Sequence, residues 1–203
     1  PRQNLEATRT LPYPSSAIYA VIADVPQYSA FLPYCASSVV TRWSHPDAHT
    51  GRRWPSEARL VVGWGGIQET FTSRIYCVPG KVVEAVGGAS QTTLPPGDIQ
   101  HHSLAEADSK NTNLKAEGIL THLLTRWTVR PLLREPNSSL ALSQRLDTDS
   151  PAKEHTEVSL AIEFQFSNPL YSAMSAAVTS RIAAVMIEAF EERVQQVLDV
   201  DAK

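Results

Sequence analysis

The last part of the chain, residues 168–200, constrains the fold most, because it reads as one long helix. Asn168 is a favoured N-cap, Pro169 suits the first helical position, and no further Gly or Pro follows before Val200. At 1.5 Å per residue such a helix is on the order of 45 Å long. Residues 182–190 are apolar on almost every side, interrupted only by Glu188. We therefore expect a curled sheet, a partner or an apolar ligand to cover this belt on most sides.

Most of the preceding chain shows the two-residue alternation that is typical of β-strands. Residues 157–166 alternate most clearly, with one apolar and one largely polar face, as in a sheet buried on one side. The same pattern predicts strands at residues 5–11, 39–43, 58–64, 67–77, 81–86 and 120–132. Gly65-Gly66 and Pro79-Gly80 read as turns between successive strands. Hairpins this short require antiparallel pairing.

Two short helices are predicted after the first strand. The first begins with Ser15 as its N-cap and ends near Asp24, and the second covers residues 27–32 and ends at Pro33. The fold class is therefore α+β, with an antiparallel sheet curled around the only helix large enough to cover its apolar face. Such a curl encloses a volume that side chains or a ligand must fill.

Two polar segments, at about residues 87–118 and 134–155, interrupt the pattern. We interpret them as insertions in one domain that spans residues 1–203, the first being mostly a mobile surface loop. No apolar run approaches the 18 residues of a membrane span. The chain begins at Pro1 without Met, which leaves open that a native N-terminus with a targeting peptide is missing.

The charge and the reactive residues exclude several classes of protein. The formal charge of -3 disfavours a nucleic-acid partner. Cys35 and Cys77 show no pairing pattern, so we expect free thiols in a reducing compartment. The six histidines form no metal-binding motif, and phosphate-loop, dinucleotide and nucleophile-elbow motifs are absent. We therefore expect no metal site and no catalytic residue.

Two ionisable side chains leave a functional interpretation open. His122 precedes an apolar stretch, and either bonds the backbone at the edge of the core or touches a ligand. Glu69 shares a strand face with Ile67 and Phe71, and either forms a salt bridge at the edge or donates a proton with a raised pKa. Neither residue specifies a reaction.

Four segments make the chain similar to a known family: residues 28–35 (YSAFLPYC), 122–128 (HLLTRWT), 163–166 (EFQF) and 190–193 (FEER). They resemble the coenzyme Q-binding proteins of mitochondria, members of the START-like, polyketide-cyclase-related superfamily. The resemblance implies the helix-grip fold. It also implies a non-enzymatic protein that binds ubiquinone, peripherally on the matrix side of the mitochondrial inner membrane. By the same resemblance it would there support quinone biosynthesis and respiratory electron transport, and its partners would include the complexes that perform them.

A polyprenyl quinone needs a long apolar tunnel and one or two hydrogen-bond donors. For an entrance we select Tyr28 with Phe31, Leu32 and Tyr34, whose aromatic rings also suit a bilayer interface. Arg126 and His122 are candidate donors to the ring carbonyls. For the tunnel wall we select Trp64, Phe71, Trp127, Leu160, Phe164, Val178, Ile182, Met186 and Phe190. Ordinary core packing is the other interpretation of each wall residue.

Two other functions fit the same sequence. An enzyme of the cyclase or aromatase type requires titratable groups that converge in the cavity, and the chain offers mainly Glu69 and His122. An interaction protein would instead use the apolar entrance residues to dock on a ribosome or a biosynthetic complex. Bacterial relatives of the resembled family include ribosome-association toxins, so the resemblance alone does not fix the partner.

Overall fold

A computed structural model describes residues 2–64, 66–103, 118–133 and 154–200. In these residues seven strands form one antiparallel sheet in the order β1-β7-β6-β5-β4-β3-β2. The predicted antiparallel meander and its α+β class are thereby confirmed. The hairpin turns are confirmed as well, with positive φ at Gly66 and Gly80 where they are needed. The strands are β1 (Gln3–Leu11), β2 (Cys35–Trp43), β3 (Pro55–Trp64), β4 (Ile67–Val78), β5 (Val82–Gly88), β6 (Leu120–Leu132) and β7 (His155–Phe166).

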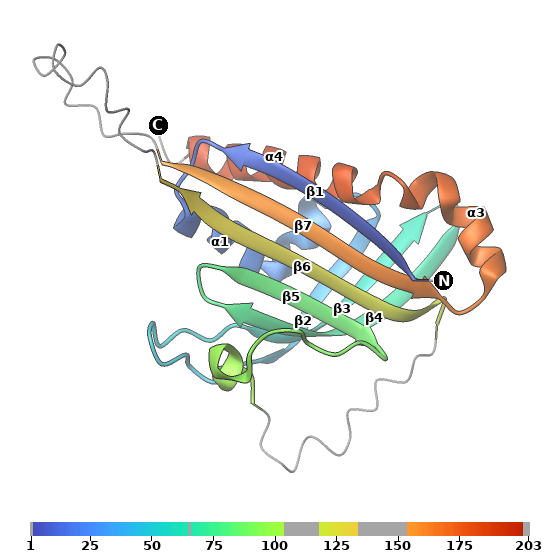
Figure 1. Ribbon diagram of the computed structural model, residues 1–203, viewed down its shortest axis with the longest axis horizontal. Helices are drawn as coiled ribbons and strands as arrows, with labels where there is room; N and C mark the ends of the chain where they lie inside the picture. The colour runs from blue at the N-terminus through green and yellow to red at the C-terminus, as the bar shows by residue number, and fades with distance from the viewer. Residues whose placement is uncertain (1, 65, 104–117, 134–153, 201–203) are drawn as a thin grey trace, which may run out of the picture.

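The α-helices gather on the concave side of the sheet. Figure 1 shows the C-terminal helix α4 lying along β1 and β7, with the short N-terminal helices beneath it. The first helix ends at Ala23 as expected, but Ser15 is its first helical residue rather than its N-cap, and Pro14 takes the cap position. The helical elements are α1 (Ser15–Ala23), η1 (Val25–Gln27), α2 (Tyr28–Phe31), η2 (Pro96–His102), α3 (Pro169–Thr179) and α4 (Ile182–Val200).

The single C-terminal helix expected from the sequence is wrong, because two helices, α3 and α4, meet at Ser180 and Arg181. The Asn168 cap is confirmed, since its side chain accepts the Leu170 N–H at 2.9 Å. At the break, the Thr179 and Ser180 hydroxyls donate to carbonyls three residues earlier, each at 3.3 Å. Such bonds compete with the helical ladder and bend helices. The sequence search for Gly and Pro therefore missed this break.

The apolar belt of α4, residues 182–190, is covered on most sides. Ala183, Ile187 and Phe190 are buried, and Ile182, Met186 and Ala189 are partly buried against the core. Only Ala184 and Glu188 of this belt are exposed.

Aromatic rings close the core where α2 meets α4. Phe190 lies 4.5 Å from Trp127 and 5.2 Å from Phe31, measured between ring centroids, and 6.3 Å from Tyr28. The Tyr28 hydroxyl donates to the Ile22 carbonyl. Burial, followed by the nearby Cys77 thiol, raises the pKa of Tyr28, so this hydroxyl stays neutral. This aromatic cluster forms a solid end to the space between sheet and helix.

Residues 89–103 run along the surface, as their polar composition predicts, and specific contacts fasten them to the sheet. At Gly88, with φ of +61°, the chain leaves the sheet, and a Cβ there would lie 2.5 Å from the Thr121 carbonyl oxygen, so the position requires glycine. Ser90 is 2 % exposed and its Oγ accepts the Leu123 N–H at 3.0 Å. The segment thus covers the convex face of β5 and β6. The rest of both predicted insertions, residues 104–117 and 134–153, lies outside the described residues.

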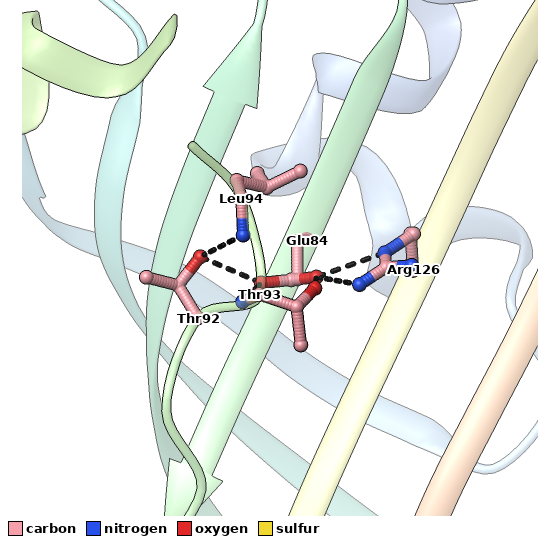
Figure 2. A network of polar contacts seen from close by, with 5 residues as sticks. All are labelled: Glu84, Thr92, Thr93, Leu94 and Arg126. Carbon is pink, nitrogen blue, oxygen red and sulfur yellow. Dashed lines mark hydrogen bonds and ion pairs between the residues drawn. The ribbon is translucent and has the colours of Figure 1, made fainter. Parts of the chain in front are cut away.

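The buried carboxylate of Glu84 fastens this segment to the sheet (Figure 2). It accepts hydrogen bonds from the Thr92 hydroxyl at 2.7 Å and from the Thr93 N–H and hydroxyl at 3.0 and 2.8 Å. Arg126 donates two further bonds to its Oε2, at 2.9 and 2.7 Å. Burial alone would raise the pKa of Glu84, but these bonds together hold that pKa below its ordinary value. Thr92 and Thr93 of this segment therefore supply hydrogen bonds that the buried, charged Glu84 carboxylate requires.

Two histidine side chains contact the backbone of β4 at a position where β3 no longer pairs with it. Pairing between β3 and β4 stops at Glu57 and Arg74, so Cys77 has no backbone partner on that side. His102 Nε2 accepts the Cys77 N–H at 2.8 Å, and His101 Nε2 lies 2.9 Å from the Cys77 carbonyl oxygen. His102 Nδ1 in turn lies 2.7 Å from the Ser56 hydroxyl. Because Nε2 must accept, this arrangement requires neutral His102.

Acid should therefore weaken the fold through His102. Burial, followed by the charge of His101, lowers the pKa of His102 from 6.5 to about 4. As the pH falls, His102 takes up its proton in the unfolded chain before it does so in the folded protein. Neutral His102 therefore contributes its full stabilisation above pH 6.5, and this contribution declines toward pH 4. We expect about 2 kcal/mol of unfolding free energy to be lost between pH 7 and pH 5. Denaturant titrations across this range measure it.

The matched variants for this pH dependence are His102→Gln and His49→Gln. Glutamine at position 102 keeps an acceptor for Cys77 but does not titrate, so its stability should change less between pH 7 and pH 5. His49 is exposed, and its replacement should leave the wild-type profile intact. A steep acid slope that persists in His102→Gln would show that another group causes it.

Candidate ligand cavity

A cavity of about 220 Å³ lies between the concave face of the sheet and the helices. Its deep end adjoins the aromatic cluster, with Tyr28 and Trp127 in its wall. Its other end lies where Leu120 begins β6, Phe166 ends β7 and Ile182 begins α4. We call this end the mouth. The turn between β3 and β4 is at the same end of the sheet as α3 (Figure 1).

Eight of the thirteen residues selected from the sequence line the cavity. Phe31, Leu160 and Phe190 do not; they pack in the core, where Leu160 is 1 % and Phe190 2 % exposed. The side chains of Trp64 and Val178 lie outside the described part of the chain. The residues on the wall are Tyr28, Leu32, Tyr34, Phe71, Trp127, Phe164, Ile182 and Met186. Their contact with a ligand stays a prediction.

The alternation pattern of the sequence contains further wall residues that were not selected. Leu60 and Val62 share the face assigned to Trp64, and Ile75 shares that of Phe71, so the signal was present. Residues from β5 and η1 had no comparable signal, because their position depends on how the sheet curls. The additional wall residues are Val25, Leu60, Val62, Ser73, Ile75, Val83, Ala85, Leu120, Leu123, Thr125, Ile162, Phe166 and Thr179.

The described cavity wall contains no Asp, Glu, His, Lys or Arg side chain. Its polar groups are the hydroxyls of Tyr28, Tyr34, Ser73, Thr125 and Thr179 and the indole N–H of Trp127. None of these groups is a strong acid or base near neutral pH. The wall can therefore hold an apolar molecule and offer it hydrogen bonds, and it supplies no group suited to general acid–base chemistry.

Both candidate quinone donors, Arg126 and His122, were wrongly placed, because they face away from the cavity. On β6 the wall residues are Leu123, Thr125 and Trp127, so alternation turns positions 122 and 126 to the convex face. Arg126 pairs with Glu84 there. His122 Nδ1 lies 2.9 Å from the Ser90 hydroxyl. These contacts account for both side chains without a ligand.

The carboxylate of Glu163 completes the surroundings of His122. Its Oε1 lies 2.6 Å from His122 Nε2 and 2.9 Å from Arg2. His122 therefore contacts two side chains on the outside of the sheet, rather than the backbone or a ligand. Glu69 stays on the concave side, toward the mouth, where its Oε1 lies 2.5 Å from the ideal Cβ position of Gly118.

Tyr34 marks the mouth with an unusual backbone. It has a φ of 66°, which non-glycine residues rarely adopt, and such strain persists where the surroundings enforce it. Its carbonyl accepts the Gly63 N–H at 2.9 Å, which holds this turn against β3. The Tyr34 side chain is 41 % exposed and also lines the cavity. At the same end of the sheet, Leu170 of α3 is 62 % exposed.

The chain belongs to the polyketide cyclase / dehydrase and lipid transport family, whose sequence model matches residues 11–191. Its fold is START-like: a START superfamily protein from Mycobacterium smegmatis superposes with a TM-score of 0.59 at 13 % identity, covering 96 % of this chain and 98 % of that one. This agrees with the helix-grip expectation.

Among curated relatives, the chain is similar to the mitochondrial coenzyme Q-binding protein coq10 of Schizosaccharomyces pombe. The two are 27 % identical over 187 residues, which cover 92 % of this chain and 84 % of the relative. The ribosome association toxin RatA of Escherichia coli is 23 % identical over 193 residues, covering 95 % and 87 %. The resemblance noted from the four sequence segments is thus confirmed.

No described helix is both long and apolar enough to cross a membrane. Cys35 and Cys77 are free thiols, as expected. Among the described residues no group of three His, Cys, Asp or Glu side chains is arranged to hold a metal ion.

Proposed function

We propose that this protein binds a polyprenyl quinone, coenzyme Q, in the cavity between sheet and helix, and that it does so without catalysis. The observation that carries the proposal is the cavity wall, which is apolar, offers a few hydroxyls and contains no Asp, Glu, His, Lys or Arg side chain among the described residues. The similarity to proteins named for coenzyme Q binding supports the choice of ligand.

The cavity suits a quinone ring with part of its tail. An engineered apolar cavity of about 150 Å³ already admits benzene, and this one measures about 220 Å³. A polyprenyl tail is longer than the cavity, so the remainder leaves through the mouth past Leu120 and Phe166. Each buried CH₂ contributes about 0.8 kcal/mol, so a few enclosed isoprene units supply most of the affinity.

The cellular setting is part of the proposal. We place the protein peripherally on the matrix side of the mitochondrial inner membrane, where it supports quinone biosynthesis and respiratory electron transport. Relatives named as mitochondrial support this location. Exposed Tyr34 and Leu170 at the mouth are suited to a bilayer interface, where a quinone could pass between membrane and cavity.

The test is extraction of the protein after purification from a quinone-producing host. An organic extract should contain a polyprenyl quinone in near-stoichiometric amount, whose ultraviolet absorption changes on borohydride reduction and whose mass identifies the tail. The matched control is the unfolded protein carried through the same purification. Unrelated lipids in equal amount, or no quinone from a folded preparation, would contradict quinone binding.

A second candidate function is docking on a ribosome, which the similarity to RatA over 95 % of the chain favours. The edge strand β2 also exposes Val39 by 53 % and Trp43 by 50 %. Exposed apolar residues of this kind occur at interaction sites. Co-sedimentation with ribosomes that Trp43→Ser abolishes would support this function, whereas sedimentation apart from ribosomes would count against it.

A further inference from the structure

Two hydroxyls in the cavity wall have no hydrogen-bond partner. Ser73 on β4 is 5 % exposed and Thr125 on β6 is half-buried, and both line the cavity. Within the described part of the chain neither side-chain oxygen takes part in a hydrogen bond. A hydroxyl that a ligand covers without accepting its hydrogen bond costs about 1–3 kcal/mol, so a ligand that fills this cavity is favoured when it carries acceptors there. These two groups are therefore available to a ligand.

The strand between them carries almost no side chain on the cavity face. On β5 the residues that face the cavity beside Ser73 and Thr125 are Gly87 and Ala85. Ala85 is opposite Thr125, and an ideal Cβ at Gly87 would lie 3.5 Å from Ser73 Oγ. Neighbouring strands are about 4.8 Å apart, so β4 and β6 are separated by roughly 10 Å. The wall therefore has a shallow hollow with one hydroxyl on each side.

We propose that this hollow receives the quinone ring, and that Ser73 and Thr125 donate hydrogen bonds to ring oxygens on its two sides. The inference rests on the proposed function, because it assigns the polar contacts of the same ligand. Hydroxyls can donate to carbonyl oxygens, and a para-quinone carries its carbonyls at opposite ends of a flat ring. Ala85 and Gly87 provide the room for that ring to lie against the sheet.

The distribution of polar groups also sets the direction of the ligand. On the mouth side of the hollow most of the wall is built from Phe71, Leu120, Phe166 and Ile182, which offer no hydrogen bond. Of the hydroxyls at this end, that of Thr179 donates to the Ala176 carbonyl and that of Tyr34 belongs to a side chain that is 41 % exposed. The tail therefore points to the mouth and the ring lies inside. The reverse orientation would bury both hydroxyls against isoprene units and leave them unsatisfied.

The test compares a ligand that carries ring oxygens with a hydrocarbon that carries none. One is a ubiquinone with a geranyl tail, and the other is a benzene ring with the same tail. In Ser73→Ala and Thr125→Val the quinone should bind about fivefold more weakly, and about twentyfold in the double variant, as expected for one hydrogen bond each. The hydrocarbon should bind as well as before or better. Isothermal titration measures both affinities.

Two further variants separate loss of the hydroxyls from general damage. Thr72→Val and Thr128→Val remove hydroxyls from the same strands on the convex face and should change neither affinity. Gly87→Ala removes no polar group but places a methyl group against Ser73 Oγ, and should weaken the quinone selectively. In the infrared spectrum, the carbonyl stretch of bound quinone should move to a higher wavenumber when either cavity hydroxyl is removed.

The outcomes distinguish this inference from the proposed function. Selective loss of quinone affinity, together with the infrared shift, supports the ring position. Tight quinone binding that the cavity variants leave unchanged, or an equal loss for quinone and hydrocarbon, overturns the ring position while quinone binding stands. Failure of the folded wild-type protein to bind the quinone overturns both.

Discussion

Replacing Ile182 with aspartate should weaken quinone binding by about a hundredfold. Ile182 lines the mouth of the cavity and is the first residue of α4. A carboxylate there must lose its water when an apolar tail passes over it, at a cost of several kcal/mol. The same carboxylate is favourable for the helix, because an acidic side chain stabilises a helix N-terminus by about 0.3–1 kcal/mol. The variant should therefore fold and lose the ligand.

Two charge changes away from the cavity serve as controls. Ala184→Asp places the same charge on the exposed side of α4, and Asp98→Lys reverses a charge in the exposed part of η2. Both should retain quinone when the purified protein is extracted and its titrated affinity is measured. If Asp98→Lys removed the ligand as effectively as Ile182→Asp, the assignment of the cavity would be wrong.

Alternation in the sequence was enough to predict the face that β4, β6 and β7 present to the cavity. Phe71, Trp127 and Phe164 were selected because the two-residue period puts them on one side, and all three line the wall. The period carries no information about depth along the strand. Leu160 and Phe190 were therefore selected with the others, although both belong to the solid core beyond the deep end.

The polar composition of residues 89–103 does not show that this surface segment is bonded to the sheet. Thr92, Thr93 and His102 look like loop residues, yet each bonds a polar group on or beside the convex face of the sheet. A sequence shows that a side chain is polar, but not whether it bonds water or a buried group such as the Glu84 carboxylate. Arg126 was misjudged for the same reason, since its partner is 42 positions away.

The polar subsite was the least predictable part of the cavity. Ser73 and Thr125 become prominent only when β5 lies between them with two small side chains, and that requires the register of three strands. Gly87 reads in the sequence as the start of a loop, whereas the structure keeps it in β5. Its missing side chain, rather than its flexibility, is what opens the wall beside Ser73.

Breaking the pair of Glu84 and Arg126 should destabilise the protein without loss of the ligand. Glu84 is fully buried, so Arg126→Met leaves a carboxylate in the protein interior with only the Thr92 and Thr93 bonds. Removing one partner of a buried pair costs about 3–5 kcal/mol. Arg126 is one-third exposed, which reduces the expected loss to about 3 kcal/mol. Denaturant unfolding at neutral pH measures this loss.

The double variant Glu84→Leu with Arg126→Met should recover part of the lost stability, because it leaves no unpaired buried charge. Quinone affinity is the decisive second measurement, since Arg126 lies on the convex face of β6 and the cavity on the concave face. All three variants should bind the quinone within about twofold of wild type at temperatures where they are folded, a change below ~0.5 kcal/mol. A folded Arg126→Met protein that cannot bind quinone would instead place the guanidinium at the ligand, and would refute the separation of the two faces.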